Sequence, residues 1–228
     1  MTSRRNFIQY FTLSLFVSAC HKSEENKNIV FVFPTYYIIL SYETPVEILW
    51  ESKFIEKLDL FYSLDNGITW LKIAEKIDAS DDKYLWLPKK INAEKIKLKL
   101  QDHDDTNYFT ISTPFELYET ATIYLDQVPE AMVDESIVTI KNKKFDDFAI
   151  LNLGNNRFKT FSLSCTHSGC TIMLFNDAFE CPCHGSMFNK KGCVKQGPAK
   201  ENLAVFYNEF DLKANKLIVF RKQIKDDC

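Results

Sequence analysis

The chain has 228 residues, of which 46% are hydrophobic, so it is long enough for one large domain or two small ones with buried cores. Its formal net charge of −3 gives no support for nucleic-acid binding. Only six glycines are present and no Walker or dinucleotide motif occurs, which argues against a phosphate-binding loop.

The first twenty residues predict an export signal. Arg4 and Arg5 precede an apolar stretch, residues 7–19, whose helix would rise only about 20 Å and could not cross a hydrocarbon core of roughly 30 Å. Residues 3–8, SRRNFI, resemble a twin-arginine export signal, the route taken by proteins that are already folded around a cofactor. An ordinary secretory signal is the alternative.

The end of this segment predicts a lipid anchor. Residues 17–20, VSAC, resemble a bacterial lipobox, in which small residues precede a lipidated cysteine. We therefore expect residues 1–20 to be a signal peptide that ends at a lipidated Cys20, followed by a polar tether over residues 21–28. The expected location is the bacterial cell envelope, where the lipid attaches the protein to a membrane.

Residues 29–118 predict a small β domain. Residues 57–73 contain two apolar-rich segments on either side of an Asn-Gly step, which is a strong hairpin signal. Residues 95–102 alternate apolar and charged side chains, as expected for a strand with one buried face. The pattern resembles an immunoglobulin-like or fibronectin type III β-sandwich.

No catalytic set of residues is visible in this domain, so we expect it to act as a spacer or as a docking module. Trp50, Trp70 and Trp86 are expected in its core, although tryptophans also suit a sugar- or cofactor-binding platform. His103 lies among three aspartates and is expected in a solvated loop; a cation site is the alternative.

Residues 119–228 contain a second β-rich region and a tight cysteine cluster. Two short loops, CTHSGC at 165–170 and CPCHGS at 181–186, each offer cysteine and histidine side chains. Two thiolates and two imidazoles would satisfy a tetrahedral zinc, but zinc fingers commonly pair like ligands. A mixed pair in each loop suits a [2Fe–2S] cluster that has two thiolates on one iron and two imidazoles on the other.

The two loops resemble those of Rieske iron–sulfur proteins, in particular the iron–sulfur subunits of quinol-oxidising cytochrome complexes. The resemblance implies an all-β chain, in which the β-sandwich is followed by a Rieske domain over residues 119–228 with one [2Fe–2S] cluster per chain. It also implies four cluster ligands: Cys165 and Cys181 on one iron, His167 and His184 on the other.

The same resemblance assigns roles to residues around the cluster. It implies a disulfide between Cys170 and Cys183, which requires an oxidising compartment. Ser186 is expected to donate a hydrogen bond to a cluster sulfur and so to stabilise the reduced state. Phe188 stands where quinol-oxidising members often have a tyrosine that makes a second such bond, so we expect a lower reduction potential here.

Four further residues depart from that pattern or fall outside it. Ser168 stands in place of a frequent leucine and Lys200 in place of a frequent proline, and both departures weigh against quinol docking. Cys193 is interpreted as a free, partly buried thiol; a disulfide with Cys228 is the alternative.

The predicted function is one-electron transfer through the cluster, in a subunit of a quinol-oxidising or other respiratory complex. Expected partners are a cytochrome or another oxidoreductase subunit, quinol and the membrane. A Rieske oxygenase would need a second iron held by two histidines, and the cluster and tether leave only His103 of the four histidines. Two alternatives stay open: the small Rieske subunit of a molybdenum oxidoreductase such as arsenite oxidase, and a zinc-stabilised binding module without redox activity.

Overall fold

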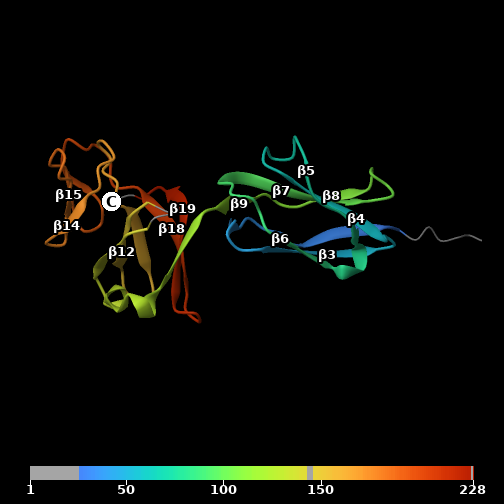
Figure 1. The fold of residues 1–228 in the computed structure, drawn as a ribbon, viewed down its shortest axis with the longest axis horizontal. Helices are drawn as coiled ribbons and strands as arrows, with labels where there is room; N and C mark the ends of the chain where they lie inside the picture. The colour runs from blue at the N-terminus through green and yellow to red at the C-terminus, as the bar shows by residue number, and fades with distance from the viewer. Residues whose placement is uncertain (1–25, 143–145, 227) are drawn as a thin grey trace, which may run out of the picture.

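A computed structural model describes residues 26–142, 146–226 and 228 of the chain. These residues form two β-rich domains that lie end to end along the long axis of the molecule (Figure 1), which confirms the all-β prediction. Among them there is no helix with the length and apolar character needed to cross a membrane. The predicted signal peptide, Cys20 and residues 21–25 of the predicted tether lie outside the described residues.

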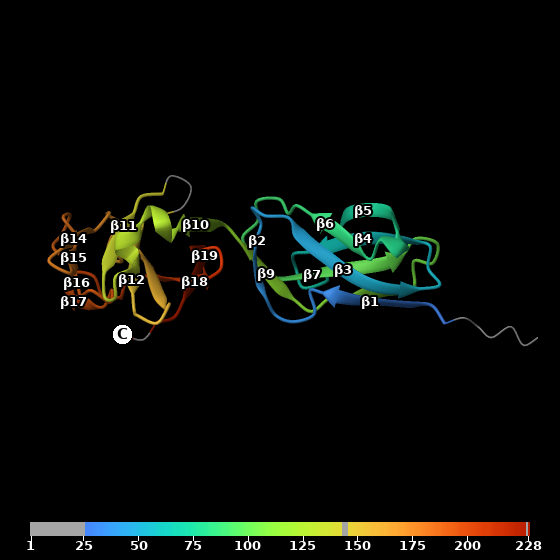
Figure 2. The same cartoon turned by 90° about the horizontal axis from the view of Figure 1, so that it is seen from below.

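The N-terminal domain contains two sheets that enclose one core; Figure 2 looks onto the first sheet with the second behind it. The first sheet has three strands, in the order β1 (Asn28–Phe33), β3 (Val46–Lys53) and β6 (Lys83–Trp86). The second has the order β2 (Ile39–Ser41), β9 (Phe115–Tyr118), β7 (Ala93–Asp102), β4 (Lys57–Ser63) and β5 (Leu71–Asp78), with β8 (Phe109–Ile111) paired to β7. A short 3-10 helix, η1 (Ala79–Asp81), connects the sheets.

Alternation along β7 explains how this core forms. Ile96, Leu98 and Leu100 are fully buried and contribute to a core that also contains Ile48 and Trp50 of β3. The predicted hairpin at the Asn-Gly step is present, because β4 and β5 pair antiparallel and both residues of the step have positive φ. The immunoglobulin-like resemblance of the domain stays a prediction.

Two sequence-based expectations need correction in this domain. Trp50 and Trp86 are buried in the core, but Trp70 is only partly buried and lies outside the core. His103 is less solvated than expected, because its Nδ1 lies 3.0 Å from Oδ1 of Asp59 and its side chain is only 27% exposed.

The C-terminal domain also has two sheets. The larger has the order β10 (Thr120–Tyr124), β19 (Lys216–Ile224), β18 (Val205–Asp211), β13 (Phe158–Ser162), β12 (Phe148–Asn152) and β11 (Ile137–Ile140). The smaller has the order β14 (Met173–Phe175), β15 (Ala178–Glu180), β16 (Met187–Phe188) and β17 (Val194–Gln196). Two 3-10 helices, η2 (Leu125–Gln127) and η3 (Pro129–Met132), follow β10.

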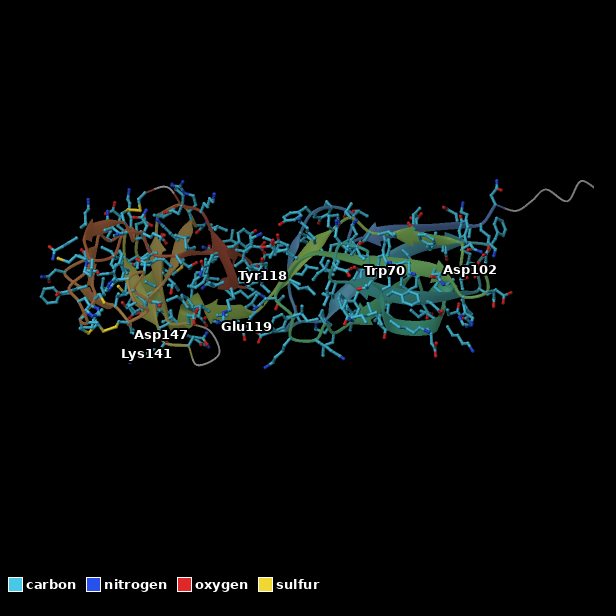
Figure 3. All side chains as sticks on the ribbon, turned by 90° about the horizontal axis from the view of Figure 1, so that it is seen from above. Trp70, Asp102, Tyr118, Glu119, Lys141 and Asp147 are labelled. Carbon is cyan, nitrogen blue, oxygen red and sulfur yellow. A yellow bond between two sulfur atoms is a disulfide. The ribbon has the colours of Figure 1, made fainter. Side chains whose placement is uncertain are left out.

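The two domains meet where β9 leads into β10, near Tyr118 and Glu119 in Figure 3. The carboxylate of Glu116, on β9, accepts hydrogen bonds from Tyr37 and from Lys222 of β19. Next to it, Nη1 of Arg221 donates to Glu119 at 3.2 Å, and the Arg221 backbone N–H donates to the carbonyl of the same glutamate. The Glu116–Lys222 ion pair therefore joins the two domains, and the Arg221–Glu119 contacts hold the segment between β9 and β10 against β19.

Candidate metal centre

The two cysteine loops have the same backbone design. Loop 165–170 is closed by a hydrogen bond from the N–H of Gly169 to the carbonyl of Cys165 at 2.7 Å. Loop 181–186 is closed in the same way, from Gly185 to Cys181 at 2.9 Å. Both glycines have positive φ (75° and 72°), a backbone conformation that residues other than glycine rarely adopt. The Cys-x3-Gly spacing, which both loops share, therefore indicates this turn from the sequence alone, in addition to the cysteine and histidine spacing.

Of the four cysteines in these loops, the structure joins Cys170 to Cys183 in a disulfide, with 6.5 Å between their Cα atoms. Cys165 and Cys181 remain as thiols and are almost fully buried, at 2% and 1% exposure. The sulfur atoms of Cys170, Cys181 and Cys183 all lie within 4.8 Å of one another, a grouping that resembles a metal site. Two of these sulfurs are bonded to each other and are not thiolates, so this trio is not the ligand set.

The two histidines lie at the surface and next to each other. His167 and His184 come from different loops, yet their ring centroids are 4.8 Å apart with the rings nearly perpendicular. Both side chains are exposed, in contrast to the buried thiols. Oγ of Ser168 lies 3.0 Å from Nδ1 of His167, so the serine in the usual leucine position contacts this ring directly.

The environment of Cys165 favours its thiolate. Burial raises the pKa of this thiol. Hydrogen bonds from the His167 backbone and from the Cys181 and Ser186 side chains lower it by more than burial raises it, so the pKa lies below its ordinary value of 9.0. Ser186 is fully buried, and its Oγ accepts the backbone N–H of Ala199 at 3.0 Å. Its own hydroxyl proton is thus directed to the sulfur of Cys165.

Phe188 lies behind the thiols and not at the surface. Its side chain is fully buried in the same core as Cys165 and Cys181, and it pairs with Phe179 across β15 and β16. Lys200, by contrast, is exposed and follows the buried Ala199. The departures at Ser168 and Lys200 therefore affect the outer surface of the site, whereas Phe188 affects its inner side.

The donor set fits a [2Fe–2S] cluster. Each loop supplies one buried thiol and one exposed imidazole, and the thiol of Cys165 has a lowered pKa. A cluster of this type has one iron with two thiolates and one with two imidazoles, which needs this separation of ligand types into two pairs. Cys165, Cys181, His167 and His184 would hold it, and it would supply a one-electron acceptor and donor.

A model of the Rieske [2Fe-2S] domain family matches residues 123–207. Residues 123–207 are a Rieske domain. Its sheet extends beyond the match, because β10 begins at Thr120 and β19 ends at Ile224. Rieske domains carry a [2Fe–2S] cluster, which confirms the predicted cofactor; the four individual ligand assignments stay predictions.

Curated relatives share this part of the chain. The ubiquinol–cytochrome c reductase iron–sulfur subunit of Bradyrhizobium diazoefficiens is 31% identical over 90 residues, which are 36% of this chain and 51% of that protein. The cytochrome b6-f complex iron–sulfur subunit of Gloeobacter violaceus is 38% identical over 74 residues, 32% of this chain and 34% of that protein. The chain thus spans about half or less of the length of these relatives.

Among solved structures, the plasma membrane Rieske protein PetC3 from Synechocystis PCC 6803 is similar over 43% of this chain and 93% of that chain, with 24% sequence identity and a TM-score of 0.33.

Outside the metal centre, one cysteine interpretation is wrong. Cys193 is not a free thiol, because it forms a disulfide with Cys228, with a Cα–Cα distance of 5.7 Å. The bond attaches the C-terminal residue to the segment before β17. The two partners are 35 residues apart in sequence, and nothing in the local pattern around either of them indicates the pairing.

Proposed function

We propose that this protein transfers single electrons through one [2Fe–2S] cluster in its Rieske domain, as a membrane-anchored protein of the bacterial cell envelope. The observation that carries the proposal is the donor set: two buried thiols and two exposed imidazoles that two loops bring to one place. Because the imidazoles are exposed, the iron that they hold would lie on the side from which a partner can approach. The thiol side is enclosed by the apolar core.

The Cys170–Cys183 disulfide supports the envelope location. Disulfides persist in oxidising compartments, and the predicted export signal leads to such a compartment independently. Attachment to a membrane through a lipid on Cys20 is part of the proposal and rests on the sequence of residues 17–20 alone.

We further propose a cytochrome-containing respiratory complex as the setting, with a cytochrome as the electron acceptor. The curated relatives carry names of ubiquinol–cytochrome c reductase and cytochrome b6-f complex subunits, which supports this choice over a molybdenum enzyme. Ser168 and Lys200 lie at the exposed side of the site and weigh against the docking of quinol there, so we propose the cytochrome as the partner.

Three measurements test the proposal. Iron and acid-labile sulfide analysis should give two of each per chain, and the reduced protein should show a rhombic EPR signal. Cys181→Ser should lose both, whereas Cys193→Ser, at a buried cysteine outside the two loops, should keep them. One zinc and no sulfide would refute the cluster.

For the anchor, Cys20→Ala should move the protein from the membrane to the soluble fraction of cells.

A further inference from the structure

The second sheet of the N-terminal domain carries a row of lysines and aromatic side chains on its outer face. Strand register places Phe61 of β4 opposite Lys99 of β7, and Lys99 opposite Ile111 of β8. Phe109 lies two residues before Ile111 and therefore on the same face, as Lys97 does relative to Lys99. We call this surface the lysine–aromatic face: Phe61, Trp70, Lys97, Lys99, Phe109 and Ile111.

At its centre, the ammonium group of Lys99 is surrounded by three aromatic rings. It lies 4.4 Å from the ring centroid of Phe61, 5.2 Å from that of Trp70 and 5.8 Å from that of Phe109. These distances are within cation–π range. In the described part of the chain, no carboxylate pairs with Lys99, and burial lowers its pKa from the ordinary value of 10.5.

The face has exposed apolar area and, at Lys99, a positive charge that no carboxylate of the described residues neutralises. Phe109 and Ile111 are 51% and 43% exposed, and the ring of Trp70, labelled in Figure 3, is partly exposed. The chain as a whole has a net charge of −3, so this cationic face contrasts with its average surface. A ligand that fits must bring a negative group for Lys99 and a flat apolar surface for the neighbouring rings.

We propose that the lysine–aromatic face binds a polysaccharide whose sugar rings carry carboxylate groups. A sugar acid holds its carboxylate directly on the ring whose C–H face can stack on Trp70 or Phe109, so one rigid unit makes both contacts. An acidic peptide has its charge and its apolar area on separate flexible side chains, and ordering them costs entropy. This interaction is independent of the cluster and would hold the N-terminal domain against an acidic glycan.

Calorimetric titration of the full chain with a galacturonic acid hexamer tests the proposal, with the neutral glucose hexamer cellohexaose as the comparison ligand. We expect the acidic hexamer to bind and the neutral one to bind at least ten-fold more weakly. Lys99→Met, which keeps the apolar stem, should weaken binding of the acidic hexamer at least ten-fold, and Trp70→Leu should also weaken it. Lys53→Met, at an exposed lysine of the other sheet, is the matched control and should bind as the wild type does.

The EPR signal and the thermal midpoint of each variant show that the fold is retained. If the acidic hexamer fails to bind, or if Lys99→Met binds it as tightly as the wild type, the proposal is wrong. Two further ligands distinguish an acidic glycan from an acidic protein and from nucleic acid. Oligoglutamate binding as tightly as the uronate would assign the face to an acidic protein instead, and tighter binding of oligothymidylate would assign it to nucleic acid.

Discussion

Lys222, on β19 of the C-terminal domain, forms an ion pair with Glu116, on β9 of the N-terminal domain. Their side chains are only 18% and 6% exposed, and Tyr37 also donates a hydrogen bond to the glutamate. A largely buried pair of this kind contributes little net stability, but removing one member leaves a charge without a partner. The junction between the domains therefore depends on both residues.

Replacing Lys222 with Met should weaken the junction. We expect a loss of about 2–3 kcal/mol in the free energy of unfolding, because the Glu116 carboxylate would stay buried with Tyr37 as its remaining partner. This loss is smaller than the full cost of breaking a buried pair because the Lys222 side chain is 18% exposed. Urea denaturation gives the loss, and small-angle scattering should show a wider range of interdomain distances. Lys225→Met, at an exposed lysine three residues further on, should change neither.

The same pair predicts a pH dependence. Burial lowers the pKa of Lys222, but hydrogen bonds to Glu116 and Tyr37 raise it more, so the folded value lies above the ordinary 10.5. A raised lysine pKa gives stability that is fully present below about 10.5 and is lost as pH rises through the folded value. The difference in unfolding free energy between wild type and Lys222→Met should be constant from pH 7 to 10 and shrink above that. A difference that instead shrinks between pH 7 and 10 would contradict the assignment.

Releasing the C-terminus should also destabilise the Rieske domain. Cys228→Ser removes a cross-link that closes 35 residues, and chain entropy alone predicts a loss of about 3–4 kcal/mol. Urea denaturation of the oxidised protein measures it. The double variant Cys193→Ser/Cys228→Ser should match the single one, since both lack the same bond. Equal stability of wild type and Cys228→Ser would show that the bond does not restrict the unfolded chain.

Phe188→Tyr should raise the reduction potential. If its hydroxyl donates to a cluster sulfur, a net hydrogen bond of roughly 0.5–1.5 kcal/mol corresponds to about 20–60 mV for one electron. Protein-film voltammetry measures the shift. Phe175→Tyr, at an exposed phenylalanine of β14, should leave the potential unchanged. An unchanged potential for Phe188→Tyr would mean that position 188 does not tune the cluster.

Ser186→Ala should shift the potential in the opposite direction. The buried hydroxyl donates to Cys165, and its loss removes a hydrogen bond that favours the more negative, reduced cluster. We expect a fall of about 20–60 mV from the same conversion. Ser164→Ala, at an exposed serine whose hydroxyl donates to the carbonyl of Gly169 at 3.4 Å, is the control. A rise in the Ser186→Ala potential would contradict the donor role.

Short-range patterns in the sequence determined most of the metal centre. Each loop carries its cysteine, histidine and glycine within six residues, so the loop geometry follows from local spacing and the glycine conformation. Alternation along β7 likewise predicted its buried face, because side chains of a strand point to opposite sides. Patterns of this kind need no knowledge of distant contacts.

Only the tertiary structure decided which distant residues meet. Cys193 and Cys228, and Glu116 and Lys222, are far apart in sequence, and each pair forms because strand pairing and sheet packing bring its members together. The tertiary structure also decides where Trp70 lies. Its large apolar ring suits a core, but its position at the end of the β4–β5 loop places it on the outer face beside Lys99. A side chain's neighbours across sheets depend on the register of strands, which local sequence does not specify.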